Sequence, residues 1–120
     1  FKDILFCSMQ VNDLVDTLLE MLVLKLNGLY HTLSSQSMSK YEFGVRLAQR
    51  FGLDAGLIRP ISWKDAGLKA ARSPNLTLRT NKLATALGHS LPTIDHGLQR
   101  LFQEYQSGYP QRLRAMRMGD

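Results

Sequence analysis

Hydrophobic positions along the chain fall into short apolar runs and longer stretches that repeat every three or four residues. Residues 3–9 form the first short run, which predicts a β-strand. A helix is predicted next, because apolar residues then recur on one helical face. These residues are Leu14, Val15, Leu18, Leu19 and Leu22. Asn12 is placed to cap this helix and Gly28 to end it.

A second strand and a second helix follow. Residues 29–33 are rich in side chains that fit a pleated surface, which predicts a strand. Ser39 and Glu42 then match a capping box, in which the serine accepts from the Glu42 amide and the glutamate reaches back to the Ser39 amide. Phe43, Leu47 and Phe51 give the helix behind it an apolar side.

The middle of the chain predicts shorter elements. Residues 54–58 favour one helical turn, and residues 59–63 favour an extended segment because the residue before Pro60 avoids helical angles. Residues 72–78 predict a loop or an edge strand, since Pro74 cannot donate a hydrogen bond within a central strand.

Two further helices are predicted near the end. Thr80 begins a helix over residues 81–87 that Gly88 closes, and Thr93 begins another over residues 94–106. Beyond that the apolar repeat is lost, so we expect residues 107–120 to be a flexible basic tail.

This order of elements predicts the α/β class, with three short strands alternating with helices. Strands separated by helices usually run parallel. The 120 residues have room for one domain, which we place at residues 1–106. The chain starts at Phe1, and we expect that a preceding segment was removed or not cloned.

Composition limits the compartment, the metals and the partners that we expect for this chain. No apolar run approaches the ~20 residues of a membrane span, so we expect no membrane partner. The single cysteine, Cys7, cannot form an internal disulfide, which favours a reducing cytoplasm. The three histidines lie in separate segments and predict no zinc site. The net charge is +5, to which residues 1–40 contribute −1 and residues 41–120 contribute +6. This positive excess would suit an anionic ligand, a nucleic acid or simple solubility.

Two catalytic motifs are missing from the sequence. No glycines recur at the G-x-G-x-x-G spacing of a dinucleotide-binding turn. No tyrosine is followed by lysine four residues later: the residues at that distance are Ser34, Val45, Tyr109 and Leu113. We therefore expect no cofactor site and no catalytic residue within this chain.

Three segments, taken in order, nevertheless resemble the C-terminal part of the extended short-chain dehydrogenase/reductase family, most closely its dTDP-4-dehydrorhamnose reductase branch. They span residues 11–15, residues 28–43, and the stretch from Arg72-Ser73-Pro74-Asn75 through Lys82 to Gly88. The resemblance covers residues 3–101. It implies a Rossmann-type fold whose N-terminal portion binds NAD(P) and supplies a Tyr-Lys pair, while this C-terminal portion closes over a nucleotide-sugar.

The resemblance implies a substrate-binding role for four residues, each of which also has a plainer interpretation. Arg72 would pair with a diphosphate, or is a solvated loop arginine. Asn75 would bond a phosphate or sugar hydroxyl, or is a turn residue bonding its own backbone. Trp63 would line a base or sugar pocket, or fills the core. Ser8 would touch the ligand, or is an ordinary loop serine.

A small basic module for nucleic acid is the alternative function. Its cations would be Arg46, Arg50, Arg59, Lys64, Lys69, Arg72 and the arginines after residue 107. No aromatic residues interleave with these charges as single-strand binders require, so we expect nucleic acid not to be the partner.

The isolated chain is also expected to self-associate. If residues 4–7 and 29–33 belong to strands of a larger sheet, their edges are exposed when that sheet is missing, and exposed edges recruit new partners. The leucine-rich helix over residues 13–25 would help to cover the contact.

Overall fold

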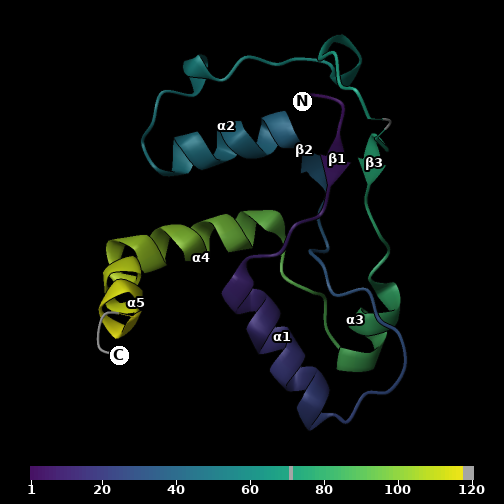
Figure 1. The fold of residues 1–120 in the computed structure, drawn as a ribbon. Helices are drawn as coiled ribbons and strands as arrows, with labels where there is room; N and C mark the ends of the chain where they lie inside the picture. Colours follow the sequence, from purple (N-terminus) through teal and green to yellow (C-terminus); the bar gives the residue numbers. More distant parts are fainter. Residues whose placement is uncertain (71, 118–120) are drawn as a thin grey trace.

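The computed structural model describes residues 1–70 and 72–117 and has a three-stranded sheet at its centre. The central strand β1 (Leu5–Phe6) pairs antiparallel with β2 (Met38–Ser39) and parallel with β3 (Asn75–Leu76), as Figure 1 shows. The α/β class is confirmed, and so is an edge strand within residues 72–78. The expectation that strands separated by helices run parallel is confirmed for β1 and β3. It is wrong for β2, a strand that the sequence analysis did not predict and that pairs antiparallel with β1 just before the second helix.

Residues 1–70 and 72–117 form five α-helices: α1 (Val11–Val23), α2 (Lys40–Arg50), α3 (Asn81–Leu87), α4 (Ile94–Gln106) and α5 (Tyr109–Arg117). Two short 3-10 turns, η1 (Ala55–Leu57) and η2 (Trp63–Asp65), lie between α2 and β3. The bounds predicted for α3 and α4 are confirmed, and η1 lies within the helical turn predicted for residues 54–58. No helix of residues 1–70 and 72–117 has the length and apolar character needed to cross a membrane.

Helix caps explain where the helices begin. The Ser39 hydroxyl accepts a hydrogen bond from the Glu42 amide at 3.0 Å, as the capping box predicts. The reciprocal half is wrong, because the Glu42 carboxylate is paired with Arg46 instead. Asn12 is also not the cap of α1: the Gln10 side chain accepts from the Asn12 and Asp13 amides at 2.6 and 2.9 Å.

The strand predicted for residues 29–33 is not a strand. Within residues 29–33 no backbone group takes part in a backbone–backbone hydrogen bond with any residue that the structure describes. Residues 59–62 belong to no helix or strand, and Ser62 has the extended backbone predicted for this segment. The prediction is wrong at Trp63, which begins η2. Residues 4–7, by contrast, are not an exposed edge, because β1 has a partner on each side and Ile4 and Cys7 are buried.

The hydrophobic core lies where α2 and α4 meet the sheet. Met38, Ile94 and Leu98 are its buried members. Phe6, Phe43 and Leu47 pack against them, with the Phe6 and Phe43 rings edge to face at a centroid distance of 5.5 Å. This side of α2 is the one that the apolar repeat predicted.

Helix α1 buries its polar side and exposes its apolar side, which is the reverse of the usual arrangement. Asp13 and Thr17 are its buried residues, whereas Leu18, Leu19 and Leu22 are 44%, 55% and 72% exposed. The apolar stripe that predicted this helix therefore lies on its outer side.

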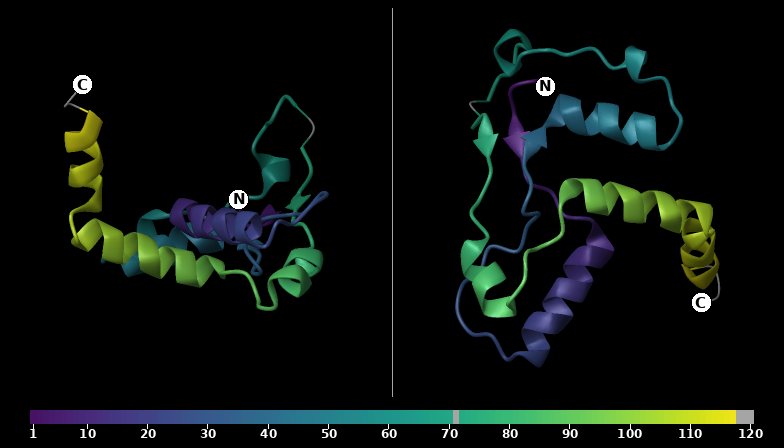
Figure 2. Two further views of the ribbon diagram at one scale, coloured as in Figure 1. Left: turned by 90° about the horizontal axis from the view of Figure 1, so that it is seen from below. Right: turned by 180° about the vertical axis from the view of Figure 1, so that it is seen from behind.

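The tail is helical where it is described. We expected no regular structure after residue 107, but α5 runs from Tyr109 to Arg117 and projects from the end of α4 (Figure 2). The Arg112 amide donates to the Gly108 carbonyl at 3.1 Å at its start. The last three residues of the expected tail, 118–120, lie outside the described residues, and the division at residue 106 stays a prediction.

The molecule is a shallow layer with two projections. Its principal extents are 46 × 37 × 28 Å. Helix α5 and the segment between α2 and β3 rise to the same side of the layer, from opposite ends (Figure 2).

Candidate functional site

A basic cavity opens at the start of β1. It has a volume of about 360 Å³ and is lined by Phe1, Ile4, Lys40, Leu68, Arg72, Ser73 and Leu76. Of these side chains, two carry a positive charge and four are apolar or aromatic. The cavity thus joins a cationic part to an apolar wall, which is the composition of a site for an anionic ligand that has a ring.

The sheet brings the two cations together. The Lys40 amide donates to the Ile4 carbonyl at 3.1 Å, and the Leu5 amide donates to the Pro74 carbonyl at 2.8 Å. The start of α2 and the segment before β3 therefore flank β1 on its two sides. Lys40 and Arg72, 32 positions apart in the sequence, reach one cavity for this reason.

Both cationic groups are available to a ligand. Within residues 1–70 and 72–117, neither the Lys40 ammonium nor the Arg72 guanidinium takes part in an ion pair or a side-chain hydrogen bond. An arginine can meet two phosphate oxygens at once, and a lysine adds a compact charge beside it. The pair can thus bind a phosphate or diphosphate group. Arg72, which the sequence analysis names as a candidate, lines this cavity, and its role in substrate binding stays a prediction. Lys40 was not among the candidates, since its only signal is its position after the Ser39 cap.

Trp63 lies beside this region without lining the cavity. Its amide donates to Asp3 Oδ1 at 3.0 Å, and the Ser62 hydroxyl donates to Asp3 Oδ2 at 2.5 Å. These bonds, the Ser62 one first, lower the pKa of Asp3. These bonds hold the segment that carries Trp63 against Asp3, which directly precedes the cavity-lining residue Ile4. The indole itself is half-buried. Neither the pocket role nor the core role predicted for Trp63 describes this position fully.

The structure separates the other two predicted residues from the cavity. Ser8 lines a different and smaller cavity of about 100 Å³, together with Gly97 and Leu98 of α4. Asn75 is exposed, and its Oδ1 accepts from the Thr77 amide at 3.0 Å and the Thr77 hydroxyl at 2.7 Å. This is the local turn that was the plainer interpretation of Asn75.

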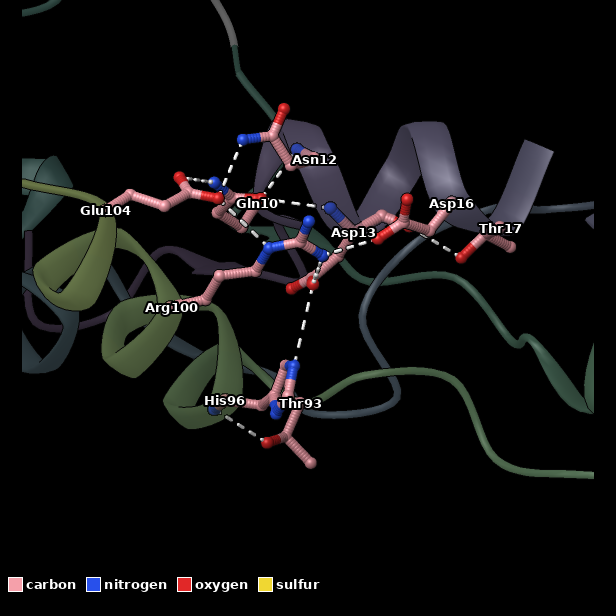
Figure 3. Close-up of polar contacts among 9 residues, drawn as sticks. All are labelled: Gln10, Asn12, Asp13, Asp16, Thr17, Thr93, His96, Arg100 and Glu104. Atoms are coloured by element: carbon pink, nitrogen blue, oxygen red, sulfur yellow. Dashed lines mark hydrogen bonds and ion pairs between the residues drawn. The ribbon is translucent and has the colours of Figure 1, made fainter. Parts of the chain in front are cut away.

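A second polar cluster, which the sequence did not reveal, joins α1 to α4 (Figure 3). Arg100 of α4 donates to Asp13 Oδ1 and to Asp16 Oδ2, each at 2.6 Å. The hydrogen bonds to Asp16 and then Asp13 raise the pKa of this guanidinium. The Asp13 side chain is only 2% exposed, so Arg100 neutralises a buried carboxylate.

Glu104, one turn further along α4, extends the cluster. Its carboxylate accepts from Arg100 Nε at 3.1 Å, and from the side-chain amides of Gln10 and Asn12 at 2.8 Å each. The helices approach closely here because residue 97 is glycine: a Cβ there would lie 3.0 Å from Gln10 Cβ. We call the set Gln10, Asn12, Asp13, Asp16, Arg100 and Glu104 the α1–α4 clasp. It fixes which side of α1 faces the rest of the chain.

Arg46 and His89 are also held in contacts within the fold. Arg46 is paired with Glu42 and with Asp95, whose pKa is lowered chiefly by Arg46 and then by Gln36. Arg46, one of the cations of the alternative nucleic-acid surface, is thus paired with carboxylates within the fold. His89 Nε2 lies 2.9 Å from Glu20 Oε1, and a bond to the Ser90 carbonyl, with this pair, raises the pKa of the histidine.

Two further kinds of site, for a metal ion and for a dinucleotide, can be compared with the described residues. Among the described residues no three His, Cys, Asp or Glu side chains are grouped as metal ligands would be. NAD(P) needs a glycine-rich turn whose free amides hold its diphosphate. The caps of α1, α2 and α4 are instead Gln10, Ser39 and Thr93, and each side chain already occupies amides of its own first turn.

Two comparisons with known proteins give a match. A family model described as "RmlD substrate binding domain" matches residues 2–107. A curated relative, "Probable low-salt glycan biosynthesis reductase Agl14" of Haloferax volcanii, is 28% identical over 110 residues, which cover 89% of this chain and 37% of the relative. The chain thus spans little more than a third of that relative's length. No solved structure matches the chain.

Proposed function

Because the chain belongs to the RmlD substrate-binding domain family, we propose that residues 1–106 are the substrate-binding part of an NAD(P)-dependent nucleotide-sugar reductase of the dTDP-4-dehydrorhamnose type. The observation that carries the proposal is the cavity at the start of β1, where Lys40 and Arg72 converge beside an apolar wall. A nucleotide-sugar has the matching parts: a diphosphate for the two cations, and rings for the apolar surface.

Each residue has a proposed task at this site. Arg72 binds the diphosphate through two oxygens, and Lys40 adds a second positive charge. Leu68 and Phe1 supply apolar surface to a ring of the ligand. Trp63 positions the segment that carries Leu68 through the Asp3 bonds, and it comes into reach of the ligand when this part closes over the nucleotide-sugar. Roles for Ser8 and Asn75 stay predictions with no support from their positions.

The reaction itself is proposed to depend on a separate N-terminal Rossmann portion. That portion binds NAD(P), which supplies the hydride, and holds the Tyr-Lys pair that moves the proton. Residues of the present chain then bind and orient the nucleotide-sugar without touching the hydride. We propose a cytoplasmic enzyme, since its single cysteine is buried and unpaired.

The isolated chain is expected to be catalytically silent. Without groups that hold the nicotinamide, the purified 120 residues should neither bind NADPH tightly nor reduce a 4-keto nucleotide-sugar, whereas the complete enzyme does both. Oxidation of NADPH in the presence of dTDP-4-dehydrorhamnose measures this. Reproducible turnover by the isolated chain, purified free of complete enzyme, would contradict the proposal.

Self-association of the isolated chain is also proposed. Residues 29–33 have no backbone–backbone partner within the described part, and the outer side of α1 is apolar, so two copies can cover each other. Sedimentation equilibrium over a wide concentration range should show a rising average mass. A strictly monomeric mass at every concentration, with cooperative thermal unfolding, would rule this association out.

A further inference from the structure

An apolar groove lies where α5 leaves the end of α4, apart from the basic cavity at the start of β1. It has a volume of about 510 Å³ and is lined by residues of α1, α2, α4 and α5. We call it the α4–α5 groove and define it by Val11, Phe51, Leu101, Tyr105, Tyr109 and Leu113. Val11, Tyr105 and Leu113 are 63%, 56% and 48% exposed, so much of this apolar lining faces water. Apolar surface gathered in this way marks a site of interaction.

Packed aromatic rings give the groove its floor. The Phe51 ring lies edge to face against Phe102 at a centroid distance of 5.2 Å, and against Tyr105 at 5.5 Å. Tyr109, the first residue of α5, lines the same groove. Rings that are already held in place lose little conformational freedom when a partner binds, and Tyr is enriched among the residues that carry most of an interface's binding energy. The floor of the groove is therefore formed before a partner binds.

The charges beside the groove are positive. Residues 107–117 contain three arginines and no acidic residue. Arg112 donates to a backbone carbonyl at 2.9 Å and lies 5.7 Å from the centre of the Tyr109 ring, and neither contact neutralises its charge. Arg114 is exposed and forms no ion pair with any residue that the structure describes. Glu104 also lines the groove, but its carboxylate is held within the α1–α4 clasp. The groove thus carries uncompensated positive charge.

These two arginines flank the side of α5 that faces the groove. Arg112 precedes Leu113 and Arg114 follows it. At 3.6 residues per turn, each arginine lies about 100° around the helix from Leu113, one on either side. A partner that inserts apolar side chains beside Leu113 therefore brings its own flanks close to both cations.

Helix α5 is an addition to the region that matches the family. That match ends at residue 107, and α5 begins at Tyr109. The helix forms one side of the α4–α5 groove, whereas no residue of α5 lines the basic cavity. Binding of a nucleotide-sugar at the start of β1 does not use it, so the inference drawn from this groove goes beyond the proposed function and does not depend on it.

We propose that the α4–α5 groove binds an acidic amphipathic helix of a partner protein. Such a helix places apolar side chains at positions i, i+3 or i+4, and i+7 in the groove, while carboxylates on its flanks meet Arg112 and Arg114. A lipid surface matches the groove less well, because an interfacial helix turns its apolar side outward into the bilayer, whereas Tyr109 and Leu113 face the groove. A second copy that bound through its own α5 would bring three arginines against three arginines.

Fluorescence anisotropy with two labelled peptides tests the proposal. Each peptide has about 14 residues, or four helical turns, with leucines at positions i, i+3, i+4 and i+7. The rest of the helix surface is glutamate in the acidic peptide and lysine in the basic one. Both are titrated with the full 120-residue chain. The acidic peptide should bind saturably and at least about tenfold more tightly than the basic one, because like charges at the rim repel.

Variants of the chain show where the acidic peptide binds. Leu113→Glu puts a carboxylate into the apolar lining and should weaken binding of this peptide at least about tenfold. Leu57→Glu, at an 80% exposed leucine of η1 outside the groove, is the matched control and should change binding less than about twofold. A chain that ends at Ser107 keeps the matched region but lacks α5, and it should show the same loss as Leu113→Glu. Circular dichroism verifies that each variant keeps its helices.

Several results would overturn the proposal. Equal binding of the two peptides would remove the acidic partner, and so would the absence of saturable binding by the acidic one. Binding that survives both Leu113→Glu and the loss of α5 would place the peptide outside the α4–α5 groove. If the acidic peptide does not bind but Leu113→Glu abolishes co-sedimentation with vesicles of phosphatidylcholine and phosphatidylserine, the groove serves a lipid surface. If that variant instead abolishes self-association in sedimentation equilibrium, the groove serves a second copy.

Discussion

Replacing Arg100 by methionine should lower the free energy of unfolding by about 3 kcal/mol, near the low end for breaking a buried ion pair. The change keeps most of the side-chain volume but removes the charge that neutralises Asp13, whose side chain is 2% exposed. It also leaves Glu104 without its contact to Arg100 Nε. Urea unfolding followed by circular dichroism measures the loss.

Two further variants make this result specific. Gln99→Met changes an exposed neighbour on the same helix and should alter stability by no more than about 0.5 kcal/mol. In the double variant Asp13→Asn, Arg100→Met, the carboxylate that Arg100→Met leaves unpaired is replaced by a neutral amide. The double variant should therefore lose less stability than the sum of the losses in the two single variants. An Arg100→Met protein as stable as the Gln99→Met control would show that the α1–α4 clasp does not hold α1.

Loss of Arg72 or Lys40 should weaken binding of the nucleotide-sugar by the complete enzyme. Arg72→Ala is expected to cost about 1.5–3 kcal/mol, or roughly 10- to 150-fold in Kd, the range for hydrogen bonds to charged groups. Lys40→Ala should fall at the lower end of that range, since an ammonium meets phosphate as a point charge rather than as a fork. Isothermal titration with dTDP-rhamnose measures both.

Arg59→Ala is the matched control, because Arg59 is exposed and lies outside the cavity lining. Its Kd should stay within about twofold of the parent enzyme, with any change due only to the lost long-range charge. If Arg72→Ala binds as tightly as Arg59→Ala, Arg72 is a solvated loop arginine. If only Lys40→Ala is silent, the diphosphate contacts Arg72 alone.

Local chemistry made part of the fold predictable. Helices α3 and α4 end where the sequence places their stops, and the Thr93 hydroxyl accepts from the His96 amide at 3.1 Å as expected of a cap. Thr80 begins α3 but makes no side-chain capping bond. Such boundaries depend on a few neighbouring residues, which is why they can be read without the rest of the structure.

Features that depend on distant partners were not predictable. The apolar stripe of α1 correctly indicated a helix, but periodicity does not say what covers the stripe. The buried side of α1 is polar because Arg100, 87 positions after Asp13, neutralises it. In the same way residues 29–33 have the composition of a strand without a strand partner, since a strand exists only where another edge pairs with it.

The residues of the candidate site were also predictable only where a local sequence motif marks them. Arg72 was found because a sequence motif marked it, and the cavity includes it. Lys40 enters the cavity only through the pairing of β1 with β2, where Leu5 lies opposite Ser39. Asn75, in the same motif as Arg72, is used by a local turn instead.

Chemical-shift mapping of the isotope-labelled chain with dTDP-rhamnose tests most directly whether this is a substrate-binding part. Amide shifts should concentrate at Lys40, Leu68, Arg72 and Ser73, which line the basic cavity, and NADPH at the same concentration should not reproduce them. Shifts confined to other surfaces, such as the apolar groove between α4 and α5, or equal shifts with NADPH, would contradict a nucleotide-sugar site at the start of β1.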